Sequence, residues 1–239
     1  SISTNNIISS IENKNKNIFG LQFHPEVYHT TNGKKILSNF LKKICKIKTK
    51  FKLENFLSNK IIDLRNQLKN KRIVCGLSGG VDSTVTSYLL QKAIGNNLFC
   101  VFVDHGLLRL NESDEIEKIF KKKFGKNFIK VNAKNIFIKR LKNIIDPEKK
   151  RKIIGKTFID VFEKEAKKIK GVEYLAQGTL YPDIIESGGT EHAEVIKTHH
   201  NRVKEILDLI NSGHIVEPLK DLYKDEVRQV GTLLGLPES

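Results

Sequence analysis

Two periods of apolar residues alternate along the chain from about residue 53 onwards. The segment 53–68 has apolar residues three and four positions apart, which predicts an amphipathic helix. The same helical period, bounded by Gly, Pro or a capping residue such as Asn111, recurs at 82–94, 111–124, 136–145, 147–169 and 223–234. Short, mainly apolar segments, which predict buried strands, lie at 72–77, 98–103, 128–131 and 174–176. The pattern predicts an α/β fold: a parallel sheet flanked by helices, with ligands at the carboxyl ends of its strands.

The first fifty residues follow a different pattern. A polar stretch of Ser, Asn and Lys at 9–17 predicts a loop or hairpin connection, and a strand at 18–23 and a helix at 33–44 follow it. The segment 46–52 is basic and polar, which is typical of a linker. We therefore expect a small N-terminal piece (1–46), a linker (47–54) and one large domain (55–239).

Composition places the chain among ordinary globular proteins. It has 239 residues, of which 39% are hydrophobic and 29% charged. No apolar run approaches the roughly 20 residues that cross a bilayer, and the N-terminus lacks the order of a signal peptide. The three cysteines lie in apolar contexts, which predicts reduced, mostly buried thiols. We expect a cytoplasmic protein without a membrane partner.

The net charge of +15 raises the question of nucleic acid. Seven of the 42 basic residues are Arg, so most are Lys, which is the weaker of the two in planar recognition. The lysines are spread along helical stretches, which favours a solvated surface plus an anionic small-molecule site. We therefore expect no nucleic-acid partner, although a basic, non-catalytic nucleic-acid-binding module stays open as the alternative.

A glycine- and hydroxyl-rich segment follows the strand at 72–77 and opens the next helix. Its residues are Ser78, Gly79, Gly80, Val81, Asp82, Ser83 and Thr84. Glycines allow a tight turn and let phosphate oxygens approach backbone N–H groups, and the start of the helix favours anions. The hydroxyls add donors. Because an anion beside phosphates is repulsive without a cation, Asp82 either caps the helix or helps to hold Mg²⁺.

The residues 78–83 resemble the pyrophosphate loop of the N-type ATP pyrophosphatases, and they lack the Lys of the Walker loop. The resemblance implies an adenine nucleotide alpha-hydrolase-like (PP-loop) fold. Longer stretches resemble the glutamine-hydrolysing GMP synthetases of that family, at 101–112, 147–155, 175–187, 196–201 and 217–228. The family usually has Asn where His105 stands. Its lid continues after Asn201 with a Gly-Gly-Leu-Pro segment, so here the lid differs or residues are missing.

This resemblance implies a two-step ligation with ATP as co-substrate and Mg²⁺ as cofactor. XMP is adenylated at O2 with release of pyrophosphate, and ammonia derived from glutamine then gives GMP and AMP. Arg151 would bind the XMP phosphate. The mobile lid would carry Lys197, Thr198, His199 and His200, with a metal site or a plain loop as alternatives for the His pair. A tRNA-thiolating pyrophosphatase is the rival, but such enzymes usually need a Cys pair near the active loops.

The segment 20–26 resembles the C-terminal end of a class I glutamine amidotransferase domain. There His24 would be the general base for a Cys nucleophile, and Glu26 would orient its imidazole. Cys45, Cys75 and Cys100 lack the Gly-x-Cys-x-Gly elbow, so we do not expect the nucleophile in this sequence. The family also implies a homodimer formed through a C-terminal domain, which would lie beyond residue 239.

Overall fold

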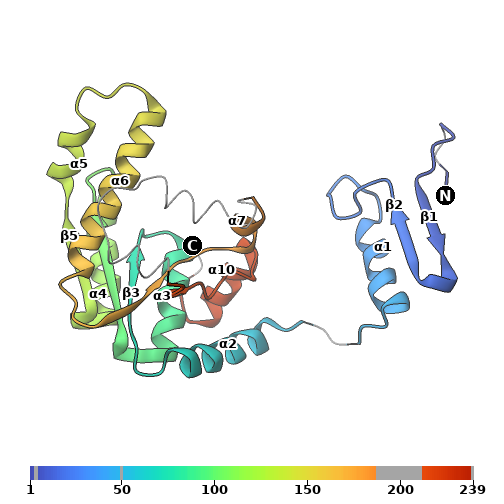
Figure 1. Cartoon of the computed structure of the whole chain (residues 1–239), viewed down its shortest axis with the longest axis horizontal. Helices are drawn as coiled ribbons and strands as arrows, with labels where there is room; N and C mark the ends of the chain where they lie inside the picture. Colours follow the sequence, from blue (N-terminus) through green and yellow to red (C-terminus); the bar gives the residue numbers. More distant parts are fainter. Residues whose placement is uncertain (3–4, 49–50, 187–211, 238–239) are drawn as a thin grey trace. The chain divides into compact units, whose positions relative to one another are not determined.

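The chain forms two compact units, Ser1–Phe51 and Lys52–Ser239. A computed structural model describes residues 1–2, 5–48, 51–186 and 212–237 (Figure 1). The division between the units lies inside the segment 47–54 that the sequence suggested as a linker.

The smaller unit contains an antiparallel hairpin and one helical segment. The hairpin joins β1 (Ser10–Asn13) to β2 (Ile18–Leu21) through a 3₁₀ turn, η1 (Lys14–Lys16). In this turn the Asn13 side chain accepts a hydrogen bond from the Lys16 N–H at 3.1 Å. The polar stretch is therefore both a connection and a strand. The helix predicted at 33–44 is α1 (Gly33–Asn39) followed by a π-helical turn, η2 (Phe40–Ile44).

The larger unit is built on a five-stranded parallel sheet in the order β5-β4-β3-β6-β7. The strands are β3 (Arg72–Leu77), β4 (Leu98–Asp104), β5 (Phe128–Asn132), β6 (Val172–Ala176) and β7 (Ile215–Val216). Each pair of neighbours is parallel, as the apolar runs predicted. The sequence did not predict β7, because two residues are too few to form a recognisable apolar run.

Helices cover both faces of this sheet (Figure 1). One face packs against α2 (Leu53–Leu68), α3 (Val81–Ile94), α4 (Glu112–Phe124) and α10 (Lys224–Leu233). The other packs against α5 (Lys134–Leu141) and α6 (Pro147–Ala166). Alternate strand residues supply the two cores: Ile73 and Cys75 face the first set of helices, and Val74 faces the second. In the described part of the chain, no helix is both long and apolar enough to span a bilayer.

Two predicted helix starts have different outcomes. At α6, Pro147 occupies the first turn and the Asp146 carboxylate accepts a hydrogen bond from the Lys149 N–H at 2.7 Å, which fits the predicted start. At α4 Asn111 stands at the predicted N-cap position, but it has a φ of 64° and its side chain makes no capping hydrogen bond. The left-handed backbone at Asn111 does not place its side chain as an N-cap does.

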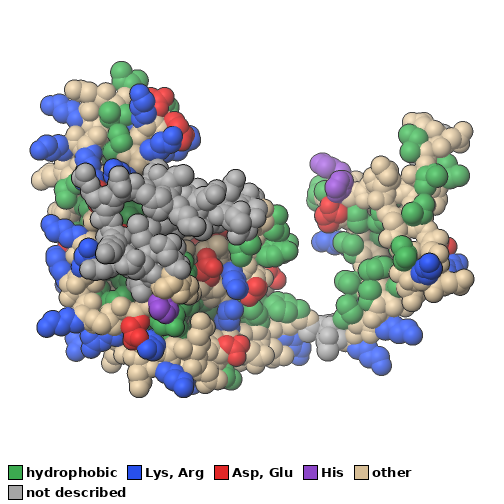
Figure 2. Space-filling view, in the orientation of Figure 1, with side chains coloured by type: hydrophobic (Ala, Val, Ile, Leu, Met, Phe, Trp, Pro, Cys, Tyr) green, Lys and Arg blue, Asp and Glu red, His purple; other side chains and the backbone are tan. Residues whose placement is uncertain are grey.

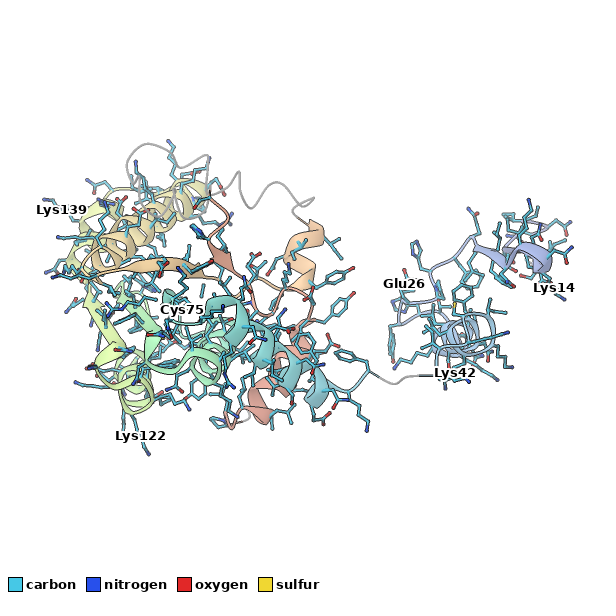
Figure 3. The ribbon with its side chains drawn as sticks, turned by 60° about the horizontal axis from the view of Figure 1, so that its bottom comes forward. Lys14, Glu26, Lys42, Cys75, Lys122 and Lys139 are labelled. Atoms are coloured by element: carbon cyan, nitrogen blue, oxygen red, sulfur yellow. The ribbon has the colours of Figure 1, made fainter. Side chains whose placement is uncertain are left out.

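The three cysteines lie in two kinds of environment. Cys75 and Cys100 are buried and face each other in register on β3 and β4, whereas Cys45 in the smaller unit is exposed. Figure 3 shows Cys75 among the side chains of the sheet and helices, while Lys122 and Lys139 project outwards. Burial raises the pKa of the Cys75 thiol to about 12, and burial followed by the neighbouring Cys75 raises the pKa of Cys100 well above its usual value.

We expect one fast-reacting thiol in the folded chain. At about pH 8 an aromatic disulfide reagent should modify Cys45 rapidly, because the thiolate is the reactive form and the two buried thiols remain protonated. All three should react after unfolding in guanidinium. The replacement Cys45→Ser should remove the fast phase, and a fast phase that survives it would contradict the burial of Cys75 and Cys100.

Candidate functional site

The loop 78–80 connects β3 to α3 at the centre of the sheet. Gly79 has a φ of +82°, and a Cβ on it would lie 2.5 Å from Cδ1 of Ile116. Gly80 is the N-cap residue of α3, in an extended conformation. The left-handed backbone and the close approach of Ile116 explain why glycine stands at position 79.

Hydroxyl groups hold the shape of this loop. Thr84 Oγ1 and Ser83 Oγ donate to the Gly80 carbonyl at 2.9 and 3.1 Å, and Ser83 Oγ also lies 3.1 Å from Ser78 Oγ. Ser78 Oγ in turn accepts from the Gly80 N–H at 3.2 Å. Ser78 and Gly80 are exposed, and the first amides of a helix lack intrahelical partners. The loop is therefore ordered by its own side chains and presents donors to solvent, as an anion site requires.

Asp82 forms an ion pair that the sequence did not reveal. Its two carboxylate oxygens accept hydrogen bonds from Lys224 Nζ at 2.7 and 2.6 Å. The interpretation of Asp82 as the cap of α3 is wrong, since the cap position belongs to Gly80 and no side chain bonds there. The cation that Asp82 needs is supplied by Lys224, which lies 142 residues later in the chain.

Lys224 is the first residue of α10, and its position there is unusual. A cation at the start of a helix is disfavoured by the helix dipole. The start of α10 is stabilised instead by the carboxylate of Glu226, which accepts from the Tyr223 N–H at 2.8 Å. Because α3 and α10 pack together, the ion pair joins the first turns of both helices. The Lys224 ammonium therefore lies beside the loop, in contact with Asp82.

The segment after β6 closes the other side of the loop. A Cβ on Gly178 would lie 3.1 Å from the Asp82 carbonyl carbon and 3.3 Å from the Ser83 nitrogen, so the two backbones are in direct contact. Thr179 Oγ1 donates to Glu217 at 2.6 Å and ties this segment to the end of β7. The chain leaves β3 towards β4 on one side and returns to β6 on the other, so the loop lies at a topological switch point, where such sheets bind ligands.

Asp104 is a buried carboxylate at the carboxyl end of β4, and it is 2% exposed. Burial alone would raise its pKa, but three partners outweigh burial and hold the pKa below its usual value. Ser113 Oγ donates at 2.6 Å, the Gly106 N–H donates at 3.1 Å, and Lys134 Nζ lies at 3.4 Å. These bonds fix the start of the loop that follows β4.

The pH dependence of stability should report on Asp104. Since its folded pKa is lowered, its stabilising contribution is complete above the unfolded value of about 3.9 and is lost as pH falls through the folded value. We expect Asp104→Asn to reduce the free energy of unfolding at pH 7 by about 1–3 kcal/mol and to weaken the pH dependence below about pH 4. Denaturant titrations from pH 2 to 7 measure both, with Asp114→Asn, which changes an exposed carboxylate, as the control. If the free energy of unfolding of Asp104→Asn fell below about pH 4 as steeply as that of the wild type, the lowered pKa of Asp104 would be contradicted.

The chemistry of the loop fits Mg²⁺. The Asp82 side chain is 31% exposed and offers hard oxygen ligands. Within the described residues, no group of three His, Cys, Asp or Glu side chains gathers into a protein-only metal cage. One carboxylate combined with substrate phosphates is the usual way in which proteins hold Mg²⁺.

Arg151, the other predicted site residue of the larger unit that the structure describes, makes no contact with the loop among the described residues. Arg151 lies on α6 with its side chain 77% exposed, where it pairs with Glu148 at 2.8 Å. Its role as a phosphate ligand stays a prediction. The four predicted lid residues, Lys197, Thr198, His199 and His200, lie outside the described residues.

The smaller unit brings His24 and Glu26 together. His24 Nδ1 lies 2.8 Å from Glu26 Oε1, and Thr30 Oγ1 donates to the His24 carbonyl at 2.5 Å. A backbone hydrogen bond of Glu26 itself, followed by the bond to His24, lowers the pKa of Glu26. Because a carboxylate can only accept, Nδ1 carries the proton and Nε2 is left as the basic nitrogen. The predicted roles of base and orienting carboxylate require such a contact, and the roles themselves stay predictions.

Two family models match successive parts of the chain. The model of class I glutamine amidotransferases matches residues 1–44, and the NAD synthase model matches residues 50–157. Among solved structures, the NH3-dependent NAD synthetase of Campylobacter jejuni shares the fold with a TM-score of 0.53 at 15% identity, over 79% of this chain and 76% of that one. A U34-tRNA thiolase of Methanococcus maripaludis has a TM-score of 0.54 at 22% identity, over 80% and 67%. The larger unit therefore has the NAD synthase-like PP-loop fold.

Sequence similarity extends across both units. A protein of Acetivibrio thermocellus named GMP synthase [glutamine-hydrolyzing] is 52% identical over 97% of this chain and 45% of its own length. The protein of the same name from Finegoldia magna is 53% identical over the same shares. The chain thus spans about half the length of the curated relatives that it matches. The continuous match over both units shows that this chain belongs to the family of the glutamine-hydrolysing GMP synthases.

Proposed function

We propose that the protein makes GMP from XMP, using ATP and the ammonia of glutamine. The observation that carries this proposal is the continuous identity of 52% over 97% of the chain. The matched region contains both the His24–Glu26 pair, proposed to belong to an amidotransferase, and the loop 78–84, proposed to belong to an ATP pyrophosphatase. We propose that the protein acts in the cytoplasm. We also propose that it forms a homodimer.

The larger unit performs the adenylation in this proposal. The O2 oxygen of XMP attacks the α-phosphate of ATP, the bond to the β-phosphate breaks, and pyrophosphate leaves. The amides at the start of α3 and the ammonium of Lys224 stabilise the charge that develops on the leaving group. Mg²⁺ bound by Asp82 would add positive charge at the same phosphates. Arg151 holds the XMP phosphate, and the lid residues at 197–200 keep water from the adenylate.

The second step consumes ammonia. Ammonia attacks C2 of the adenylated XMP, the C2–O2 bond breaks, AMP leaves with O2 as one of its phosphate oxygens, and loss of a proton gives GMP. In the smaller unit His24 Nε2 is the base that activates a Cys nucleophile for glutamine hydrolysis, while Glu26 holds the imidazole through Nδ1–H. Cys45, Cys75 and Cys100 do not supply this nucleophile.

The thiolase alternative is disfavoured by the cysteines of the larger unit. A thiolating site needs reactive thiols beside the loop, whereas Cys75 and Cys100 are buried and have raised pKa values. The charge distribution on the visible face of Figure 2 favours no dedicated nucleic-acid surface on that face. Figure 2 shows Lys and Arg side chains scattered over several elements of the visible face. On that face, basic side chains spread in this way favour a solvated surface.

Pyrophosphate release from ATP tests the proposal. Release by the chain with ATP, MgCl₂ and ammonium should depend on XMP and should yield GMP and AMP in equal amounts. Parallel reactions replace XMP with deamido-NAD or with tRNA and a sulfur donor. Pyrophosphate release that does not depend on XMP, or that is stimulated by either substitute, would overturn the assignment.

A further inference from the structure

The ion pair between Asp82 and Lys224 occupies the groups that a phosphate ligand would use. Lys224 Nζ lies within 2.7 Å of both Asp82 oxygens, so its ammonium is directed at the carboxylate. Neither side chain is deeply buried, at 43% and 31% exposed. Both belong to first helical turns, and Asp82 places a negative charge where the dipole of α3 would otherwise attract anions. The pair therefore opposes the binding of a bare anion.

A polyphosphate without a metal must overcome two obstacles in this loop. It meets the charge of Asp82, and it must compete with that carboxylate for the donors of Lys224. A polyphosphate that carries a divalent cation meets neither obstacle, because the cation attracts Asp82 while the phosphate oxygens take Lys224. The Asp82–Lys224 pair is then replaced by two pairs, one between Asp82 and the cation and one between Lys224 and the phosphate.

We propose that the Asp82–Lys224 ion pair makes the loop select metal-complexed polyphosphate over the free anion. This inference rests on the proposed function, because it assumes that the loop holds the pyrophosphate part of ATP. Asp82 excludes the free anion and accepts the metal complex, and Lys224 is the donor that the exchange releases. Specificity for the metal complex thus depends on a repulsive group as well as on attractive ones.

Calorimetric titration of the chain with inorganic pyrophosphate tests the inference, in EDTA and in excess MgCl₂. The wild-type chain should bind at least about tenfold more tightly with magnesium, a difference of about 1.4 kcal/mol. Asp82→Asn should bind metal-free pyrophosphate about tenfold more tightly than the wild type, and magnesium should then add little. The further change Lys224→Met in this variant should remove the gain, because Lys224 is the donor set free.

A matched variant separates the ion pair from net charge. Asp225→Asn removes one carboxylate from the same first turn of α10, where Asp225 is 87% exposed and pairs with Arg228. It should bind pyrophosphate as the wild type does in both conditions. An equal gain in Asp225→Asn would overturn the inference, since general charge would then explain the result.

The outcomes also separate this inference from the proposed function. If the wild type binds the magnesium complex but Asp82→Asn gains no affinity for the free anion, the inference is wrong and the proposed function stands. If the wild type binds pyrophosphate in neither condition, both are wrong. Thermal unfolding verifies that each variant is folded, and Asp82→Ser repeats the test should Asp82→Asn be unfolded.

Discussion

Replacing Lys224 with methionine is expected to lower kcat/KM for XMP-dependent pyrophosphate release by about 10²–10³-fold, the usual cost of removing one preorganised donor from a transition state. Methionine keeps most of the length of the side chain and removes its charge. The ammonium has no other recorded partner than Asp82 in the described structure, so the loss should be one of phosphate stabilisation. Initial rates at several ATP concentrations give the ratio.

The stability of Lys224→Met should change little. Its ion pair is half exposed, and such pairs contribute about 0–1 kcal/mol, while removal of a cation from a helix start is favourable. Lys60→Met is the control, because it breaks a different ion pair, the one between Lys60 and Asp221 in the segment before α10. We expect it to retain near wild-type rates. A Lys224→Met protein with unimpaired kcat/KM would remove Lys224 from the site.

Gly79→Ala is expected to have the second largest effect. The left-handed backbone at a φ of +82° costs an alanine about 1–2 kcal/mol, and its Cβ would collide with Cδ1 of Ile116 at 2.5 Å. Because the loop moves to relieve the collision, we expect about a hundredfold loss of activity, in line with the sensitivity of catalysis to small displacements. Rates of pyrophosphate release and chemical denaturation measure the two effects.

Two further variants divide the effect of Gly79→Ala into its causes. Gly95→Ala has a similar positive φ of 56° and open space around its Cβ, so it should lose stability and keep its activity. Ile116→Val, combined with Gly79→Ala, removes the colliding atom and should restore part of the activity. A loss of activity as large in Gly95→Ala would show that the loop geometry is not the cause.

The sequence predicts the larger unit well where local signals are strong. The strands β3, β4, β5 and β6 are short and mainly apolar, and glycines end the helices before β4 and β5, so their places along the chain and their parallel arrangement could be inferred. Their order within the sheet was not predicted. The loop 78–84 was found because its chemistry lies in one short segment. Features that depend on backbone torsion, such as the left-handed Asn111, could not be read from residue types.

The partners of the loop illustrate what spacing cannot show. Lys224 meets Asp82, and Gly178 contacts the first turn of α3, because the sheet places the ends of β3 and β6 side by side. No periodicity links residues that lie so far apart in sequence. One signal was present: Lys224 stands at the start of a predicted helix, where a cation needs an explanation.

The separation of 142 residues between Asp82 and Lys224 also has a kinetic consequence. Contacts between distant segments form after local ones, because the entropy of closing a long loop must be overcome first. The α3 hydrogen bonds and the β3–β4 pairing are comparatively local, whereas the complete loop needs β6, the segment at 178 and α10 in place. A refolding chain is therefore expected to regain its helical circular dichroism before it can bind pyrophosphate. Pyrophosphate binding would then mark the last stage of folding.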